Sequence, residues 1–172
     1  RVLMILLVCN GLNSAVGVLQ VLDPDRFLPR EYSEVVEAQG GPLGYVTDDG
    51  TQVIRPPGLS DNPGAVCGPA TTASLLGVVG LTLRLNWWTK AMGVLFAGLG
   101  VAAIFLSHVR TNILILGGMV VAYTLVLLLQ SELRRAAITA AFAGGLAVLG
   151  FAGAIALGGT AVFDRFVTLV QE

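Results

Sequence analysis

The sequence predicts an all-α membrane protein with about five transmembrane helices and one structured loop. Of its 172 residues, 55% are hydrophobic and only 12% are charged, whereas soluble domains carry about 25% charged residues. The mean hydropathy is +0.80, and the apolar residues gather in runs of about 20, the length that crosses a bilayer. These runs predict the lipid bilayer as a partner, and we expect no nucleic acid. The net charge of −1 does not bear on nucleic acid, because the distribution of the charges is what matters.

The first predicted span covers residues 1–22. Its apolar run ends at Asp23-Pro24-Asp25, because a proline after an acidic turn stops a helix. The run contains Asn10, Asn13 and Ser14. Polar side chains within a membrane are expected to contact other helices rather than lipid.

Residues 23–64 form the only substantial polar region and are predicted to be the structured loop. A short helix is expected over 31–39, stopped by Gly40-Gly41. Residues 45–47 and 51–54 flank Asp48-Asp49-Gly50, a sequence that favours a β-hairpin. The second strand would lead Arg55 into Pro56-Pro57-Gly58, which opens a stiff turn running to Gly64. We call residues 55–64 the Arg55 turn.

Four further apolar runs predict spans over residues 65–83, 91–109, 111–130 and 136–163. Residues 164–172 are expected to start another region outside the membrane. Trp87 and Trp88 stand before the third span, which is typical of a membrane interface. In the last span, Ala140/Gly144 and Ala154/Gly158 have the spacing of small residues at close helix contacts. A general excess of Gly and Ala would explain these spacings equally well.

The distribution of Lys and Arg predicts the orientation in the membrane. With residue 1 inside, the spans alternate and five cations fall on each side, so the total count does not decide. Lys and Arg are enriched in the short loops on the cytoplasmic side of a membrane. The two short loops that this orientation places inside, 84–90 and 131–135, are the basic ones. The Arg55 turn, Arg110 and Arg165 then lie together on the outer face.

These three arginines are candidates for a site that binds a polyanion such as pyrophosphate. Arginine keeps its charge, and its planar fork binds phosphate oxygens in pairs. His108, the only histidine, is a candidate general base, because imidazole exchanges protons near neutral pH. The simpler alternative is that the arginines contact lipid headgroups and His108 is a packing residue. Zinc-ligand spacings and phosphate-binding glycine loops are absent from the sequence, so we expect neither a metal nor a cofactor.

Three motifs occur in a recognisable order. Residues 55–63 read Arg-Pro-Pro-Gly-Leu-Ser-Asp-Asn-Pro, residues 107–111 read Ser-His-Val-Arg-Thr, and residues 163–169 read Phe-Asp-Arg-Phe-Val-Thr-Leu. From about Val46 onward, the chain resembles the bacterial O-antigen ligase and polymerase family of polytopic membrane glycosyltransferases. The motifs look like that family's Arg-x-x-Gly…Asn-Pro, Ser-x-Ser-Arg and Arg-Phe…Leu segments. Gly64 and Val109 depart from the pattern, which often has Asn and Ser there.

The resemblance implies that Arg55 and Arg110 bind the pyrophosphate of an undecaprenyl-linked glycan. Arg165 and His108 remain further candidates for the site. The protein would transfer or polymerise that glycan onto an acceptor glycan or lipid, at the periplasmic face of the bacterial inner membrane. The family's catalytic histidine follows the last motif at a position beyond residue 172, so the catalytic residue is unknown. We therefore expect a fragment of a longer protein, inactive alone.

The sequence also allows two other classes of protein. A transporter should carry acidic or polar residues deep within its spans or broken helices at the middle of the bilayer. The charges here gather at the ends of the apolar runs instead. A non-enzymatic membrane scaffold, with the outer loop as a protein-interaction surface, is the remaining alternative.

Overall fold

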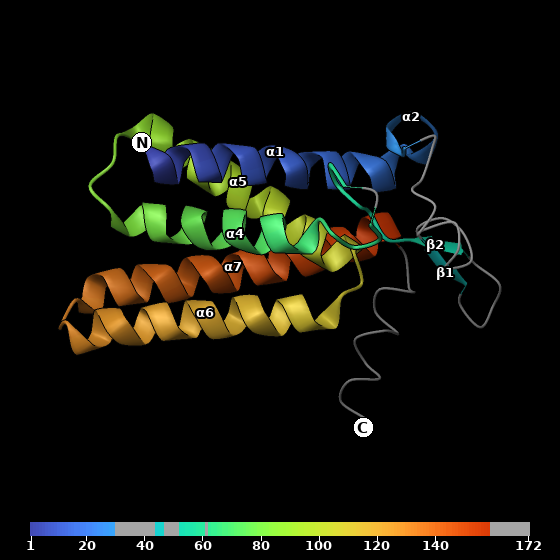
Figure 1. Ribbon diagram of the computed structural model, residues 1–172. Helices are drawn as coiled ribbons and strands as arrows, with labels where there is room; N and C mark the ends of the chain where they lie inside the picture. Colours follow the sequence, from blue (N-terminus) through green and yellow to red (C-terminus); the bar gives the residue numbers. More distant parts are fainter. Residues whose placement is uncertain (30–43, 47–51, 61, 159–172) are drawn as a thin grey trace, which may run out of the picture.

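The computed structural model describes residues 1–29, 44–46, 52–60 and 62–158 (Figure 1). The architecture is that of an all-α membrane protein, as the sequence predicts. Within the described residues, four helices are long and apolar enough to cross a membrane. They are α1 (Val2–Leu22), α5 (Trp87–Leu106), α6 (Arg110–Leu129) and α7 (Leu133–Gly158). A multi-pass membrane protein in contact with the bilayer follows from these four helices.

A fifth apolar helix, α4 (Cys67–Thr82), packs against both α1 and α5. It has 16 residues, fewer than the roughly 20 that cross a bilayer, so the predicted span over 65–83 is only partly helical. Gly64 has a φ of 73°, which interrupts helical backbone and delays the helix until Cys67. At the other end Leu83 is extended. Among the described residues, four of the five predicted spans are thus long enough to cross a bilayer, and the remaining one corresponds to the shorter apolar helix α4.

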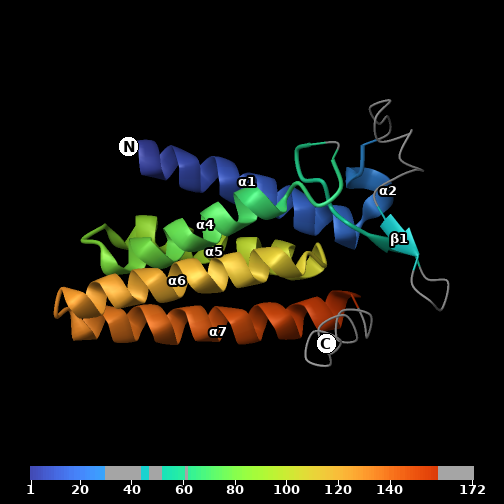
Figure 2. The same ribbon diagram turned by 60° about the horizontal axis from the view of Figure 1, so that its bottom comes forward.

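Successive helices run in opposite directions, so the connections gather at two ends of the bundle (Figures 1 and 2). One end holds the link from α1 to α4 and the link from α5 to α6. The opposite end holds residue 1, the link from α4 to α5 and the link from α6 to α7. The Arg55 turn and the Ser107-His108-Val109-Arg110 motif consequently lie at the same end of the molecule.

Two helices begin earlier than the sequence indicates. α5 starts at Trp87 rather than at 91, because the Asn86 side chain accepts the backbone N–H of Thr89 at 2.9 Å and so caps the helix. α7 starts at Leu133 rather than at 136. Its described part ends at Gly158, and the predicted continuation to 163 lies outside the described residues.

The described part of the polar loop contains a short helix and a hairpin. α2 (Pro24–Phe27) follows α1 directly. β1 (Gly44–Val46) and β2 (Gln52–Ile54) pair antiparallel, with Tyr45 opposite Val53. The predicted hairpin is thus confirmed, and β2 leads straight into the Arg55 turn. The helix expected over 31–39 lies outside the described residues.

Close helix contacts are made by glycines that the sequence does not single out. A Cβ on Gly77 of α4 would overlap the carbonyl oxygen of Gly93 on α5, and a Cβ on Gly100 would overlap Ser74 and Ala70. The predicted close contact at Ala140/Gly144 is wrong, because a Cβ on Gly144 would meet no atom within 4 Å. Small residues therefore bring α4 and α5 together. On α7, Gly144 leaves space, whereas a Cβ on Gly150 would overlap Val101 of α5.

Candidate functional site

The Arg55 turn folds back from β2 and lies beside the second half of α1 (Figure 2). Gln20 Nε2 donates to the carbonyl oxygen of Gly58 at 2.8 Å, and the Gly58 N–H donates to Gln20 Oε1 at 2.9 Å. Nearer the middle of the helix, the Leu59 N–H donates to Asn13 Oδ1 at 2.7 Å. At 1.5 Å per residue, Asn13 stands about 13 Å before the end of α1. The turn thus lies against the second half of α1, at the level of this helix rather than beyond its end.

The start of the turn, Pro56 to Gly58, is enclosed by protein. Pro56 and Pro57 are fully buried, and Gly58 is buried with a φ of 70°. A side chain at Gly58 would be strained at this φ and would overlap Asn13 Oδ1. Arg55, immediately before the two prolines, is half-buried. Its backbone position is therefore fixed by rigid, packed neighbours.

The link between α5 and α6 consists of Ser107, His108 and Val109, which we call the α5–α6 corner. His108 takes a φ of 56°, and this left-handed residue reverses the chain within three residues. Ser107 Oγ donates to the carbonyl oxygen of Ile104 at 2.7 Å. Ser107 and His108 are both buried, so the corner is packed rather than loose.

The end of the Arg55 turn lies against the α5–α6 corner, because a Cβ on Gly64 would stand 3.3 Å from Val109 Cγ2. The Cys67 thiol, just after the turn, donates to Ser107 Oγ at 2.9 Å. Val109 packs against the cluster that contains Val66 and Cys67. Arg55 lies within electrostatic reach of the Cys67 thiol. The structure thus brings together the two arginine motifs that the sequence places far apart.

Arg110 is the first residue of α6, and the first turn of this helix contains no acidic residue. The N-terminus of a helix carries a partial positive charge, so a cation there is unfavourable by about 0.3–1 kcal/mol. The exposed N–H groups of a first turn also bind anions. The backbone of the first turn of α6 is thus a position that favours an anion, and it follows directly after the α5–α6 corner.

The left-handed backbone conformation of His108 limits the residues that can replace it. Asparagine tolerates the left-handed region, so His108→Asn should keep the fold. His108→Val should lower the free energy of unfolding by about 1–2 kcal/mol, because a branched side chain is strained there. Thermal unfolding of the two detergent-solubilised variants and of the unmodified protein gives the comparison. Equal thermal midpoints for His108→Val and His108→Asn would show that backbone strain at this position does not set the stability.

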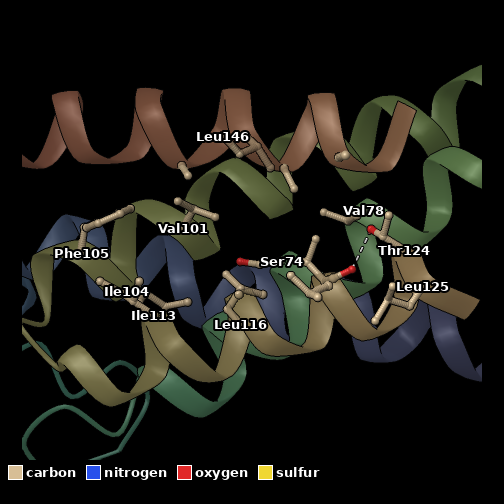
Figure 3. A pocket seen from close by; sticks show the side chains of 17 residues that line it. Ser74, Val78, Val101, Ile104, Phe105, Ile113, Leu116, Thr124, Leu125 and Leu146 are labelled. Atoms are coloured by element: carbon tan, nitrogen blue, oxygen red, sulfur yellow. Dashed lines mark hydrogen bonds between the residues drawn. The ribbon is translucent and has the colours of Figure 1, made fainter. Parts of the chain in front are cut away.

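An apolar cavity of about 440 Å³ lies beneath the corner, between α4, α5, α6 and α7 (Figure 3). It starts at Phe105 and Ile113, one turn below the corner, and reaches Leu125. The distance from Ile113 to Leu125 along α6 is about 18 Å. Its two hydroxyls, on Ser74 and Thr124, donate to backbone carbonyls of their own helices at 2.7 and 2.8 Å. The cavity therefore presents a hydrocarbon surface, suited to an apolar chain.

The remaining predicted site features are placed as follows. Arg165 lies outside the described residues. In the part of the chain that the structure describes, no three His, Cys, Asp or Glu residues are grouped to hold a metal ion. Cys9 and Cys67 are both free thiols.

Sequence reasoning missed Gln20 as a site residue. It identifies Asn13 as a polar residue within the first span but expects it to meet another helix, whereas it meets the Arg55 turn. Gln20 stands in the last turn of the same run, where a polar residue resembles an ordinary helix end. The available signal was spacing, because Asn13, Gly17 and Gln20 share one helical face.

Comparisons with protein-family models, with curated proteins and with solved structures found no match to this chain.

Proposed function

We propose that this chain forms the donor-binding part of a membrane glycosyltransferase of the O-antigen ligase or polymerase type. The donor is an undecaprenyl-pyrophosphate-linked glycan, bound at the periplasmic face of the bacterial inner membrane. One observation carries the proposal: the Arg55 turn and the α5–α6 corner meet directly above an elongated apolar cavity. A cationic site over a hydrocarbon cavity matches a lipid with a polyanionic headgroup.

Arg55 and Arg110 would bind the pyrophosphate oxygens of the donor. In the reaction, an acceptor hydroxyl attacks the anomeric carbon of the glycan, and the bond from that carbon to the pyrophosphate oxygen breaks. Negative charge grows on the departing pyrophosphate, and arginines already in place stabilise it. The hydroxyl proton passes to a base that we assign to no residue of this chain.

The cavity between α4, α5, α6 and α7 would hold part of the polyprenyl chain. Its upper end, at Phe105 and Ile113, lies one helical turn below the corner. A chain anchored there would continue down the bundle while the pyrophosphate stays at the outer face. This arrangement would align the anomeric carbon at the membrane surface, where an acceptor glycan can reach it.

A transporter is the second candidate, favoured by the non-helical backbone of the Arg55 turn at the depth of α1. Irregular backbone within a membrane lines binding sites in many transporters. The two candidates differ in the chemistry of the product. Transfer leaves the glycan covalently attached to an acceptor and releases undecaprenyl pyrophosphate, whereas transport moves a solute unchanged.

The proposal is tested by binding of undecaprenyl pyrophosphate to the solubilised protein, with undecaprenol as the matched lipid without phosphate. We expect undecaprenyl pyrophosphate to bind at least tenfold more tightly, and inorganic pyrophosphate to compete. Equal affinities for the two lipids would contradict a pyrophosphate site. Release of undecaprenyl pyrophosphate from a glycan-linked donor then separates transfer from transport.

Filling the cavity is expected to weaken donor binding. Ala143 lines the cavity, so the larger side chain of Ala143→Phe should occupy space that the polyprenyl group needs. We expect the Kd for undecaprenyl pyrophosphate to rise about tenfold, which corresponds to a loss of about 1.4 kcal/mol of binding free energy. Ala141 is exposed on the same helix and does not line the cavity. Ala141→Phe is therefore the matched control and should leave the Kd unchanged. If both variants had the same Kd, the polyprenyl group would bind outside this cavity.

A further inference from the structure

We propose that Gln20 and Asn13 of α1 are positioning residues that hold the Arg55 turn at its depth in the membrane. The two side chains make three hydrogen bonds to the backbone of Gly58 and Leu59. We call this pair of amides the α1 clamp. Neither Gln20 nor Asn13 belongs to the predicted arginine or histidine motifs. The clamp itself does not depend on the reaction proposed above, whereas its effect on donor binding rests on that proposed function.

The chemistry of the clamp fits the needs of irregular backbone inside a membrane. A non-helical segment there exposes N–H and C=O groups that lipid cannot satisfy, at a cost of several kcal/mol each. A primary amide has both a donor and an acceptor, so Gln20 satisfies the N–H and the C=O of Gly58 together. Gln20 is fully buried. Its Nε2 also donates to the carbonyl oxygen of Phe27 at 3.3 Å, so without the turn the buried amide would keep only this longer bond.

Packing makes the clamp specific for this turn. Gly17 lies between the two amides on the helix, and a Cβ there would meet Val66 Cγ2 at 2.6 Å. A Cβ on Gly58 would overlap Asn13. Asn13, Gly17 and Gln20 thus form one continuous face of α1 that is shaped for residues 58–66.

Fixing Gly58 also fixes Arg55. Only Pro56 and Pro57 lie between them, and both are rigid at φ and fully buried. On the other side, Val66 and Cys67 connect the turn to the α5–α6 corner. The turn is therefore held at both ends, by the clamp at Gly58 and Leu59 and by the corner at Val66 and Cys67, with Arg55 three residues before Gly58.

The test is the exposure of the tip of the turn in membranes. Leu59 is 71% exposed, so Leu59→Cys introduces a thiol at the tip that keeps the backbone bond to Asn13. Cys9→Ala removes the other exposed thiol, and Cys67 is buried. The rate of labelling by a membrane-impermeant maleimide is measured in this background. We expect slow labelling, because the tip lies below the membrane surface.

Gln20→Met keeps the length of the side chain and removes its hydrogen bonds, so labelling should become about tenfold faster. Gln20→Glu keeps an acceptor for the Gly58 N–H and should label at a rate between the two. Asn10→Leu is the matched control. Asn10 lies on the same helix but bonds to the carbonyl oxygen of Leu6, so its replacement should leave the rate unchanged. Equal rates in Gln20→Met and Asn10→Leu would overturn the clamp.

Binding of undecaprenyl pyrophosphate to the same variants separates the clamp from the proposed function. We expect Gln20→Met to raise the Kd about tenfold and Asn10→Leu to leave it unchanged. Faster labelling of Gln20→Met with an unaltered Kd would overturn the positioning role. If the unmodified protein does not bind this lipid at all, the proposed function fails, while the labelling rates still decide the clamp.

Discussion

Replacement of Arg55 or Arg110 by alanine is expected to abolish glycan transfer while leaving the amount of protein in the membrane unchanged. Each change removes a permanent charge and a paired set of donors from the pyrophosphate. Loss of one donor that stabilises developing charge lowers turnover by about 10²–10³-fold in well-studied enzymes. Transfer is measured as glycan attached to its acceptor in cells that carry the complete protein.

The control for this prediction is Arg26→Ala. Arg26 lies at the same end of the molecule, but it is exposed and stacks over the Phe27 ring at 5.6 Å. We expect Arg26→Ala to transfer normally. Lysine at 55 or 110 should restore part of the activity, because it keeps the charge and loses the planar fork. Normal transfer by either alanine variant would remove that arginine from the site.

Gly100→Val is expected to have the largest effect on stability. A Cβ at this position would overlap Ser74 Oγ and the carbonyl oxygen of Ala70, and backbone atoms of a packed helix cannot move aside cheaply. Overpacking of this kind costs about 1–3 kcal/mol and sometimes more. We therefore expect α4 and α5 to separate and the solubilised protein to unfold at a clearly lower temperature.

Gly98→Val is the matched control on the same helix. A Cβ on Gly98 would meet no atom within 4 Å, so valine there should be tolerated in the bundle. The thermal midpoints of both variants and of the unmodified protein give the comparison. Similar midpoints for Gly98→Val and Gly100→Val would show that helix propensity, rather than the contact between α4 and α5, sets the stability.

The fold class follows from the sequence because span length and apolar content are local properties. The residues at which helices begin and end are harder to predict from the sequence. The capping bond of Asn86 makes α5 begin at Trp87. A hydropathy pattern instead indicates a span only from the residue after the last charged one. Gly64 delays α4 because of its backbone conformation, which composition does not reveal.

For the candidate site, the sequence offers candidate residues but does not indicate what supports them. The motifs make Arg55 and Arg110 candidates, and the structure brings their segments together through the contact between Cys67 and Ser107. That contact joins two apolar helices through small polar groups, and one sequence does not indicate such pairs. The cavity is likewise a property of how four helices diverge. The Ala140/Gly144 spacing was interpreted as close packing, whereas both residues line open space.

The α1 clamp also has a consequence for the order in which the chain is assembled in the membrane. Gln20 and its partner Gly58 are 38 residues apart. At synthesis rates of about 5–20 residues per second, α1 exists for roughly 2–8 seconds before the turn emerges. During that interval its two amides have no turn to bind, so α1 begins as an incompletely satisfied helix. Biogenesis of this protein therefore depends on a late loop to complete its first span.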